Sequence, residues 1–84
     1  MNQALTVFGL LVDQRAERAP EVQEVITRYG EDIIARMGVP DPSKEKGLII
    51  LVYKGESTSV GRFYEELVNI SGVKVQMMNF AQEI

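Results

Sequence analysis

Residues 47–53 read Gly-Leu-Ile-Ile-Leu-Val-Tyr, a short unbroken apolar run that is rich in β-branched residues. Lys46 precedes this run, and Lys54 and Gly55 follow it. That length and these flanking residues predict a strand rather than a helix. Successive side chains of a strand point to opposite faces of the sheet, so a strand that is apolar at every position is apolar on both faces. We therefore expect this strand in the middle of a sheet.

Three more segments have the character of strands. Residues 4–12 are apolar on both faces apart from Thr6 and Gly9, which predicts a second central strand. Residues 31–39 and 73–80 alternate between apolar and other side chains. Such alternation is typical of strands with one solvated face, so these two are expected at the edges of the sheet.

Two helices are predicted between these strands. The first runs from about Ala19 to Tyr29, because Pro20 fits the first helical position and apolar side chains follow at helical spacing. The second begins after the Ser-Thr-Ser sequence at 57–59, which can cap it, and ends before Gly72. Its apolar face comprises Val60, Phe63, Tyr64, Leu67 and Val68.

The predicted elements follow one another as strand, helix, strand, strand, helix, strand. Placing the two doubly apolar strands inside gives the strand order 4-1-3-2. This is the ferredoxin-like βαββαβ arrangement, an α+β fold with an antiparallel sheet and both helices on one face. Within that sheet we expect the first and third strands alone to run parallel to each other. With 84 residues the chain is expected to form a single domain over residues 1–84.

Two helices cover only one face of four strands, so the other face of the central strands must stay open. We expect several hundred Å² of apolar surface there, and patches above about 300–600 Å² usually mark an interface. Gly9 suits the face that a helix approaches closely, so its neighbours Phe8 and Leu10 are expected on the open face. Together with Ile34 and Arg36 they form the predicted interface.

Composition argues against several classes of function. The chain has no cysteine and no histidine, which removes thiolate chemistry, the commonest metal ligand and the usual general base. Its net charge of −3 argues against binding to nucleic-acid phosphates. No apolar run approaches the roughly 20 residues of a membrane span, and the N-terminus does not resemble a signal peptide. We therefore expect a cytoplasmic protein that is not an enzyme and has no bound metal or cofactor, no direct nucleic-acid partner and no membrane partner.

One candidate ligand site is the connection of residues 13–19, together with the unpaired N–H groups that open the first helix. Helix N-termini bind anions and carboxylates. The predicted ligand-binding residues are therefore Asp13, Arg15, Ala19 and Glu21, together with Arg36. An ordinary strand–helix loop, with Asp13 as a local turn former, is the alternative interpretation.

Arg36 is also a candidate in its own right. It lies among apolar neighbours on an edge strand, and we expect it on the sheet face away from the helices. There it could bind an anion or pair with an acid across an interface. Alternatively, it is a solvated charge that discourages aggregation through the edge of the sheet.

Two further groups of residues are given weaker roles. The acidic pairs Glu31–Asp32 and Glu65–Glu66 do not converge, because adjacent side chains point apart on a strand and on a helix, so we expect them to be solvated. Met37, Met77 and Met78 could make an adaptable contact surface. Core packing is nevertheless the expected role of Met37 and Met77.

Residues 34–40, Ile-Ala-Arg-Met-Gly-Val-Pro, and residues 70–75, Ile-Ser-Gly-Val-Lys-Val, lie on either side of the apolar run. With the chain around them, from Leu5 to Met78, they resemble a family of small bacterial proteins known as iron-only hydrogenase system regulators. The resemblance implies an ACT-like ferredoxin fold that assembles as a dimer or higher oligomer, and regulation rather than catalysis. The fold is also similar to the regulatory domain of nickel-responsive repressors. That domain binds nickel mainly through histidines and a cysteine, which this chain lacks, so nickel binding is not implied.

Two functions stay open at this point. The first is a non-catalytic regulatory or sensor module that forms a homo-oligomer through its sheet and binds a small effector between subunits. The second is a structural interaction domain, such as an assembly adaptor, that has no small ligand. A small enzyme of the dimeric-barrel type is disfavoured, because histidine, cysteine and converging carboxylates are all missing.

Overall fold

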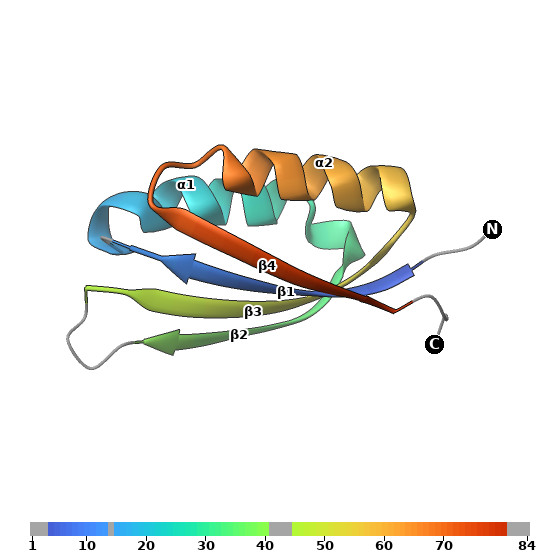
Figure 1. Ribbon diagram of the computed structural model, residues 1–84, viewed down its shortest axis with the longest axis horizontal. Helices are drawn as coiled ribbons and strands as arrows, with labels where there is room; N and C mark the ends of the chain where they lie inside the picture. Colours follow the sequence, from blue (N-terminus) through green and yellow to red (C-terminus); the bar gives the residue numbers. More distant parts are fainter. Residues whose placement is uncertain (1–3, 14, 41–44, 81–84) are drawn as a thin grey trace.

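The computed structural model describes residues 4–13, 15–40 and 45–80. Both α-helices lie on one face of a four-stranded sheet, and Figure 1 shows the opposite face uncovered. A short 3₁₀ turn, η1, joins the first helix to the second strand. The elements in chain order are β1 (Ala4–Val12), α1 (Arg15–Arg28), η1 (Gly30–Asp32), β2 (Ile33–Pro40), β3 (Gly47–Gly55), α2 (Ser57–Val68) and β4 (Val73–Phe80).

The sheet has the strand order β2-β3-β1-β4, which is the predicted order 4-1-3-2 read from the other edge. All three neighbouring pairs are antiparallel. The expectation of a parallel pair between the first and third strands is therefore wrong. Each crossover through a helix makes the two strands that it joins parallel, whereas the direct connection from β2 to β3 reverses the chain. Consequently β3 runs opposite to β1.

The core lies between the sheet and the helices and is centred on aromatic rings. Phe8 and Leu10 of β1 are fully buried there, so the prediction that they belong to the open face is wrong. The rings of Phe8 and Phe63 meet edge to face with centroids 5.0 Å apart, and the rings of Tyr53 and Phe63 stack at 4.9 Å. The other fully buried side chains of this layer are Thr6, Val12, Val22, Leu51 and Leu67.

Gly9 lies on the opposite face from the one expected. A Cβ atom at Gly9 would meet the carbonyl oxygen of Gln76 and the Cδ1 atom of Ile50, both at 3.9 Å, which is ordinary contact distance. No helix therefore needs this glycine for a close approach. The positions beneath the helices carry large side chains instead, because the space between a helix and a sheet must be filled to the density of a protein interior.

A β-bulge in β2 decides which face its side chains take. Ile33 lies opposite Tyr53 on the helix face, and the register then shifts between Ile33 and Ala35. Beyond the shift, Arg36 lies opposite the buried Leu51, so it faces the helices. The prediction that Arg36 faces away from the helices is wrong, because one extra residue inverts the alternation of all the side chains that follow.

The bounds of β1 and β4 are those predicted, whereas α1 begins at Arg15, about one turn earlier than predicted. Pro20 lies inside α1 and not at its start. Proline has no N–H to donate to the carbonyl four residues earlier, so the helix lacks one backbone hydrogen bond there. The buried face formed by Val22, Val25 and Ile26 holds the helix against the sheet despite that loss.

Candidate functional site

The uncovered side of the sheet, which we call the open face, is almost entirely apolar. Its members follow from the strand registers, since they alternate with the residues that face the helices. Lys54, Lys74 and Gln76 are its polar members among the described residues. The apolar members are Leu5, Val7, Gly9 and Leu11 of β1, Ala35, Met37 and Val39 of β2, Leu48, Ile50 and Val52 of β3, and Met78 and Phe80 of β4.

Large side chains of the open face are exposed in the single chain. Met37 is 57% exposed and Met78 is 58% exposed. Met77 points to the helix side of the sheet but is still 41% exposed, so the expected core role of Met37 and Met77 is wrong. Ile34, which the sequence places in the interface, lies at the bulge and is 52% exposed. Its role in an interface stays a prediction.

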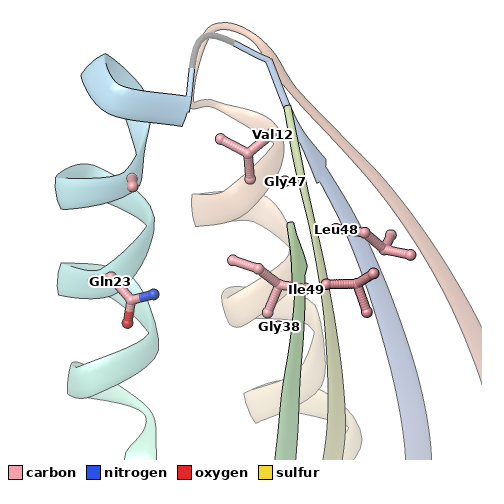
Figure 2. A pocket seen from close by; sticks show the side chains of 8 residues that line it. Val12, Gln23, Gly38, Gly47, Leu48 and Ile49 are labelled. Carbon is pink, nitrogen blue, oxygen red and sulfur yellow. The ribbon is translucent and has the colours of Figure 1, made fainter. Parts of the chain in front are cut away.

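A cavity of about 270 Å³ lies between α1 and one end of the sheet (Figure 2). Ala19 and Gln23 of α1 line one side, and Figure 2 shows the Gln23 side chain projecting from the helix toward the strands. Gly38 of β2 and Gly47 of β3 line the other side. A Cβ atom at Gly38 would meet no atom within 4 Å, so the space exists partly because Gly38 has no side chain. Val12, Val39, Leu48 and Ile49 complete the lining.

Arg36 is not part of the cavity lining but is bonded to it through Gln23. Its Nη2 atom donates a hydrogen bond of 2.8 Å to Oε1 of Gln23, which itself lines the cavity. Arg36 and Gly38 are two residues apart in β2 and face the same side of the sheet. Within the described part of the chain, no carboxylate lies within ion-pair distance of Arg36. The cavity therefore has mostly apolar walls, and its polar lining residue, Gln23, is bonded to an exposed guanidinium group outside the lining.

The other predicted ligand-binding residues do not form one site at a helix start. Because α1 begins at Arg15, Ala19 and Glu21 lie in its second turn, beyond the N–H groups that a helix start leaves unpaired. Ala19 instead lines the cavity, and Glu21 is exposed and pairs with Arg18 at 3.8 Å. The Asp13 amide donates to the Gly72 carbonyl oxygen at 2.8 Å. The side chain of Arg15 lies outside the described residues.

A cluster of hydroxyl and carboxylate groups lies where β3, η1 and α2 meet, at the far end of β3 from Gly47. The hydroxyl groups of Tyr53 and Ser59 are 2.5 Å apart, and Ser59 Oγ donates to Asp32 Oδ2 at 3.1 Å. The Tyr53 hydroxyl lies 3.3 Å from the same oxygen, and its single proton can go to this oxygen or to Ser59. Burial raises the pKa of Tyr53, because desolvation disfavours the phenolate. Asp32 is thus a structural acceptor and not the solvated charge expected from the sequence.

Glu66 joins the two helices. It accepts a hydrogen bond from the hydroxyl of Tyr29, and its Oε1 lies 2.6 Å from Nη1 of Arg28. The hydrogen bond from Tyr29 and the nearby Arg28 lower the pKa of Glu66 below its usual range. The expectation that Glu66 is only solvated surface is therefore wrong, while its neighbour Glu65 is exposed as expected.

Neither acidic cluster forms a metal centre. Across residues 4–13, 15–40 and 45–80, no group of three His, Cys, Asp or Glu side chains is arranged to hold a metal ion. The expectation that the chain binds no metal or cofactor stays a prediction. In those same ranges, no helix has the length and apolar character needed to cross a membrane.

Sequence reasoning missed Gln23 and Gly38 as parts of the candidate site. The available signal was small: Ala19, Gly38 and Gly47 have little or no side chain at positions that face the layer between α1 and the sheet. Small residues on three elements predict a cavity only when the strand register shows that they face one another. The bulge in β2 shifts that register, and the sequence does not show the bulge.

The topology and the open face define an α+β, ferredoxin-like domain with one uncovered sheet face. Residues 4–77 match the model of the TM1266-like family, described as "Iron-only hydrogenase system regulator, putative". The chain belongs to this family, and the resemblance noted from residues 34–40 and 70–75 is confirmed.

Solved structures share the fold of this chain. The uncharacterized protein TM1266 from Thermotoga maritima is 26% identical, with a TM-score of 0.88 over 94% of this chain and 99% of that one. A conserved protein of unknown function from Bacteroides thetaiotaomicron, described as a possible oxidoreductase, is 8% identical, with a TM-score of 0.52 over 95% of this chain and 100% of that one. The apo form of CPII from Thiomonas intermedia K12, a nitrogen regulatory PII-like protein, is 14% identical, with a TM-score of 0.51 over 98% of each chain. The last two share the fold alone. No curated protein matches the chain.

Proposed function

We propose that this chain is a non-catalytic, ACT-like regulatory module that works as a dimer or higher oligomer of itself. Its copies pack through their open faces, and a small effector binds beside the interface between subunits. The open face is the observation that carries the proposal, because a sheet with one uncovered apolar face needs a partner to exclude water from it. The description of the family supports a regulatory role.

The shape of the open face favours a second copy of this chain as the occupant. Four strands of about eight residues, about 4.8 Å apart and 3.3 Å per residue, have a footprint of roughly 500 Å². Because side chains project from the sheet, its accessible surface is larger than this footprint and approaches the roughly 800 Å² per partner of a standard interface. The footprint is therefore large enough for one flat sheet to cover another.

The distribution of charge on the open face also suits sheet-on-sheet packing. Lys54 lies opposite Leu5 at one end of the face, and Lys74 lies opposite Leu11 at the other. The centre around Val7 is apolar. Lysine side chains at the rim keep their ammonium groups in water while their stems cover apolar surface, and polar rims around apolar centres are usual in interfaces.

Two neighbouring methionines of β4 provide a matched test of the interface. Met78 belongs to the open face, whereas Met77 points to the helix side. Burying one such side chain is worth about 1.5–3 kcal/mol, and a symmetric dimer buries it twice, so Met78→Glu should weaken association at least about 100-fold. Met77→Glu should leave the mass unchanged. Light scattering over a concentration series measures both variants, and circular dichroism reports the fold.

Three outcomes contradict the proposed assembly. If the folded wild type has the mass of one chain even at high concentration, it does not form a homo-oligomer. If Met77→Glu and Met78→Glu weaken association equally, the open face is not the contact between copies. Loss of association in Met77→Glu alone would place the interface on the helix side.

The alternative function is an assembly adaptor, because the same open face could cover a different protein and need no effector. A thermal-shift screen of amino acids, small carboxylates, nucleotides and metal ions separates the two. A ligand that binds only the folded form raises the melting temperature, so stabilisation by one compound supports the regulatory module. No shift across the whole panel, together with a single-chain mass, supports the adaptor.

A further inference from the structure

We infer that the cavity between α1 and the β2–β3 edge binds a small aliphatic monocarboxylate, whose carboxylate is held by Arg36 and Gln23. This inference rests on the proposed function, because it names the binding site and the chemical class of the effector that a regulatory module would bind. The chain's own residues supply both ends of the site: apolar walls for a short branched hydrocarbon, and two N–H-bearing groups for an anion.

The walls of the cavity select a small apolar body. Val12 and Ile49 present hydrocarbon, and Ala19 contributes one methyl group from α1. Gly38 leaves open space beside it, and Gly47 lines the same cavity. At about 270 Å³ the cavity lies just below the roughly 300–1,000 Å³ of typical small-molecule sites, so its ligand must be short.

The polar end of the site selects a carboxylate. Arg36 presents a planar guanidinium group, which matches two carboxylate oxygens at once. Its hydrogen bond to the Gln23 oxygen, 2.8 Å long, fixes the guanidinium beside the cavity. That bond occupies the amide oxygen of Gln23, which leaves the amide –NH₂ as the donor on the cavity side (Figure 2). An anion therefore meets two donor groups, whereas a cation would meet the positive charge of Arg36.

The side chains around the cavity argue against an amino acid as the ligand. The lining side chains are neutral, and Gln23 is the polar one among them. An ammonium group would have to leave water without a carboxylate partner, which is costly. A monocarboxylate avoids that cost, because its charge pairs with Arg36 and its remainder is hydrocarbon.

The position of the cavity gives its occupant a route to the assembly. Val39 and Leu48 line the cavity and also belong to the open face, at the ends of β2 and β3. A ligand in the cavity lies against the same strand ends whose side chains, pointing to the other face, a second copy would contact. Binding and association are then coupled through shared residues.

The direct test is a titration of ¹⁵N-labelled protein with isovalerate, a branched C5 carboxylate, followed by amide chemical shifts. Saturable shifts are expected at Gly38, Gly47 and Ile49. The neutral isostere 3-methylbutan-1-ol should bind at least tenfold more weakly, because it loses the charge-assisted hydrogen bonds. Leucine should also bind at least tenfold more weakly than isovalerate. Equal binding of the alcohol, or tighter binding of leucine, overturns the assignment of the ligand class.

Two variants with matched controls locate the site. Arg36→Gln should weaken isovalerate binding at least tenfold, whereas Arg62→Gln, which removes an exposed arginine of α2, should not change it. Gly38→Leu should abolish binding by filling the cavity, whereas Gly61→Leu places the same side chain on an exposed position of α2. Melting temperatures check that all four variants fold. Unchanged isovalerate binding in folded Arg36→Gln and Gly38→Leu overturns the inference.

The same titration on Met78→Glu separates the two proposals. Isovalerate binding that persists in a single-chain protein supports the cavity as a site, even where the wild type also proves to be a single chain and the assembly fails. Conversely, a wild type that self-associates but shows no saturable shifts with isovalerate overturns the cavity site and leaves the assembly standing.

Discussion

The two faces of the sheet are built from the same kinds of side chain but differ in what covers them. On the helix face, Phe8 and Leu51 are fully buried beneath α1 and α2. On the open face, one residue along each strand, Val7 and Val52 are only partly buried by their neighbours in the sheet. Both faces of the central strands are apolar, so the sheet holds more apolar surface than two helices on one face can cover.

Because of that difference, the two faces of one strand determine two separate properties, the stability of the single chain and its association with a partner. The helix face fixes the stability of the single chain, because it is already desolvated. The open face contributes to stability only when a partner covers it, so its effect depends on protein concentration. Substitutions at adjacent residues of β1 should therefore fail in different ways.

The largest expected difference is between Phe8→Lys and Val7→Lys. An unpaired charge in the core costs several kcal/mol, comparable to the total stability of a small domain, so Phe8→Lys should not fold. Val7→Lys should keep the native circular dichroism spectrum and shift the mass toward one chain. Far-ultraviolet circular dichroism and light scattering on the same samples measure both effects. A folded Phe8→Lys protein would contradict the assignment of the helix face.

A smaller effect is expected at the buried hydroxyl cluster, which lies on the helix side of the sheet. Tyr53→Phe removes the hydroxyl group that contacts Ser59 and Asp32. The 3.1 Å hydrogen bond from Ser59 to Asp32 remains. The expected loss is about 1 kcal/mol of unfolding free energy at neutral pH. Denaturant titration measures this loss, and the mass of the variant should equal that of the wild type. A loss of association would show that the cluster and the open face are coupled.

Alkaline pH sharpens the test at Tyr53. Burial raises the pKa of Tyr53 in the folded state, so its contribution to stability is fully present below the ordinary tyrosine value of 10.0 and is lost as pH rises through the folded pKa. Tyr53→Phe should therefore lose less stability than the wild type between neutral and strongly alkaline pH. Parallel denaturant titrations at both pH values give the comparison, and identical losses in the two proteins would contradict it.

The smallest expected effect is at Glu66, on the helices and away from the open face. The hydrogen bond from Tyr29 and the proximity of Arg28 lower the folded-state pKa of Glu66 below the ordinary 4.5. Its stabilising contribution is thus present above about the ordinary pKa and is lost as pH falls through the folded pKa. Glu66→Gln should be slightly destabilised at neutral pH and match the wild type in acid.

Glu65→Gln is the control for this position, because Glu65 is adjacent and exposed. It should have the stability of the wild type at neutral pH. If both substitutions give the same pH profile, the contacts of Glu66 with Tyr29 and Arg28 do not contribute.

The sequence predicted the fold well because the decisive signals were local and strong. The two doubly apolar strands had to be central, and together with the βαββαβ arrangement this gave the strand order. The prediction of which β1 side chains face the helices was wrong, because it relied on one residue. Gly9 was interpreted as a close approach by a helix, but the helix-facing positions are instead filled by Phe8 and Leu10.

The candidate site was less predictable for two physical reasons. The bulge between Ile33 and Ala35 inverts the side-chain alternation of β2, and this moves Arg36 to the helix face. Pro20 was expected at the start of a helix but lies inside one, so the predicted site at the helix start was displaced by about one turn. The cavity is lined by residues with small or no side chains on three elements, and only the assembled register brings them together.

The most direct test of the open face as the contact between copies is an isotope-filtered NOE experiment on a mixture of methionine-methyl-labelled and unlabelled chains. Met37 and Met78 report on the open face, and Met77 reports on the helix side of the same strand as Met78. The predicted result is intermolecular cross-peaks from the methyl groups of Met37 and Met78 and none from Met77. Cross-peaks from Met77 alone, or none from any of the three at millimolar concentration, would contradict the account.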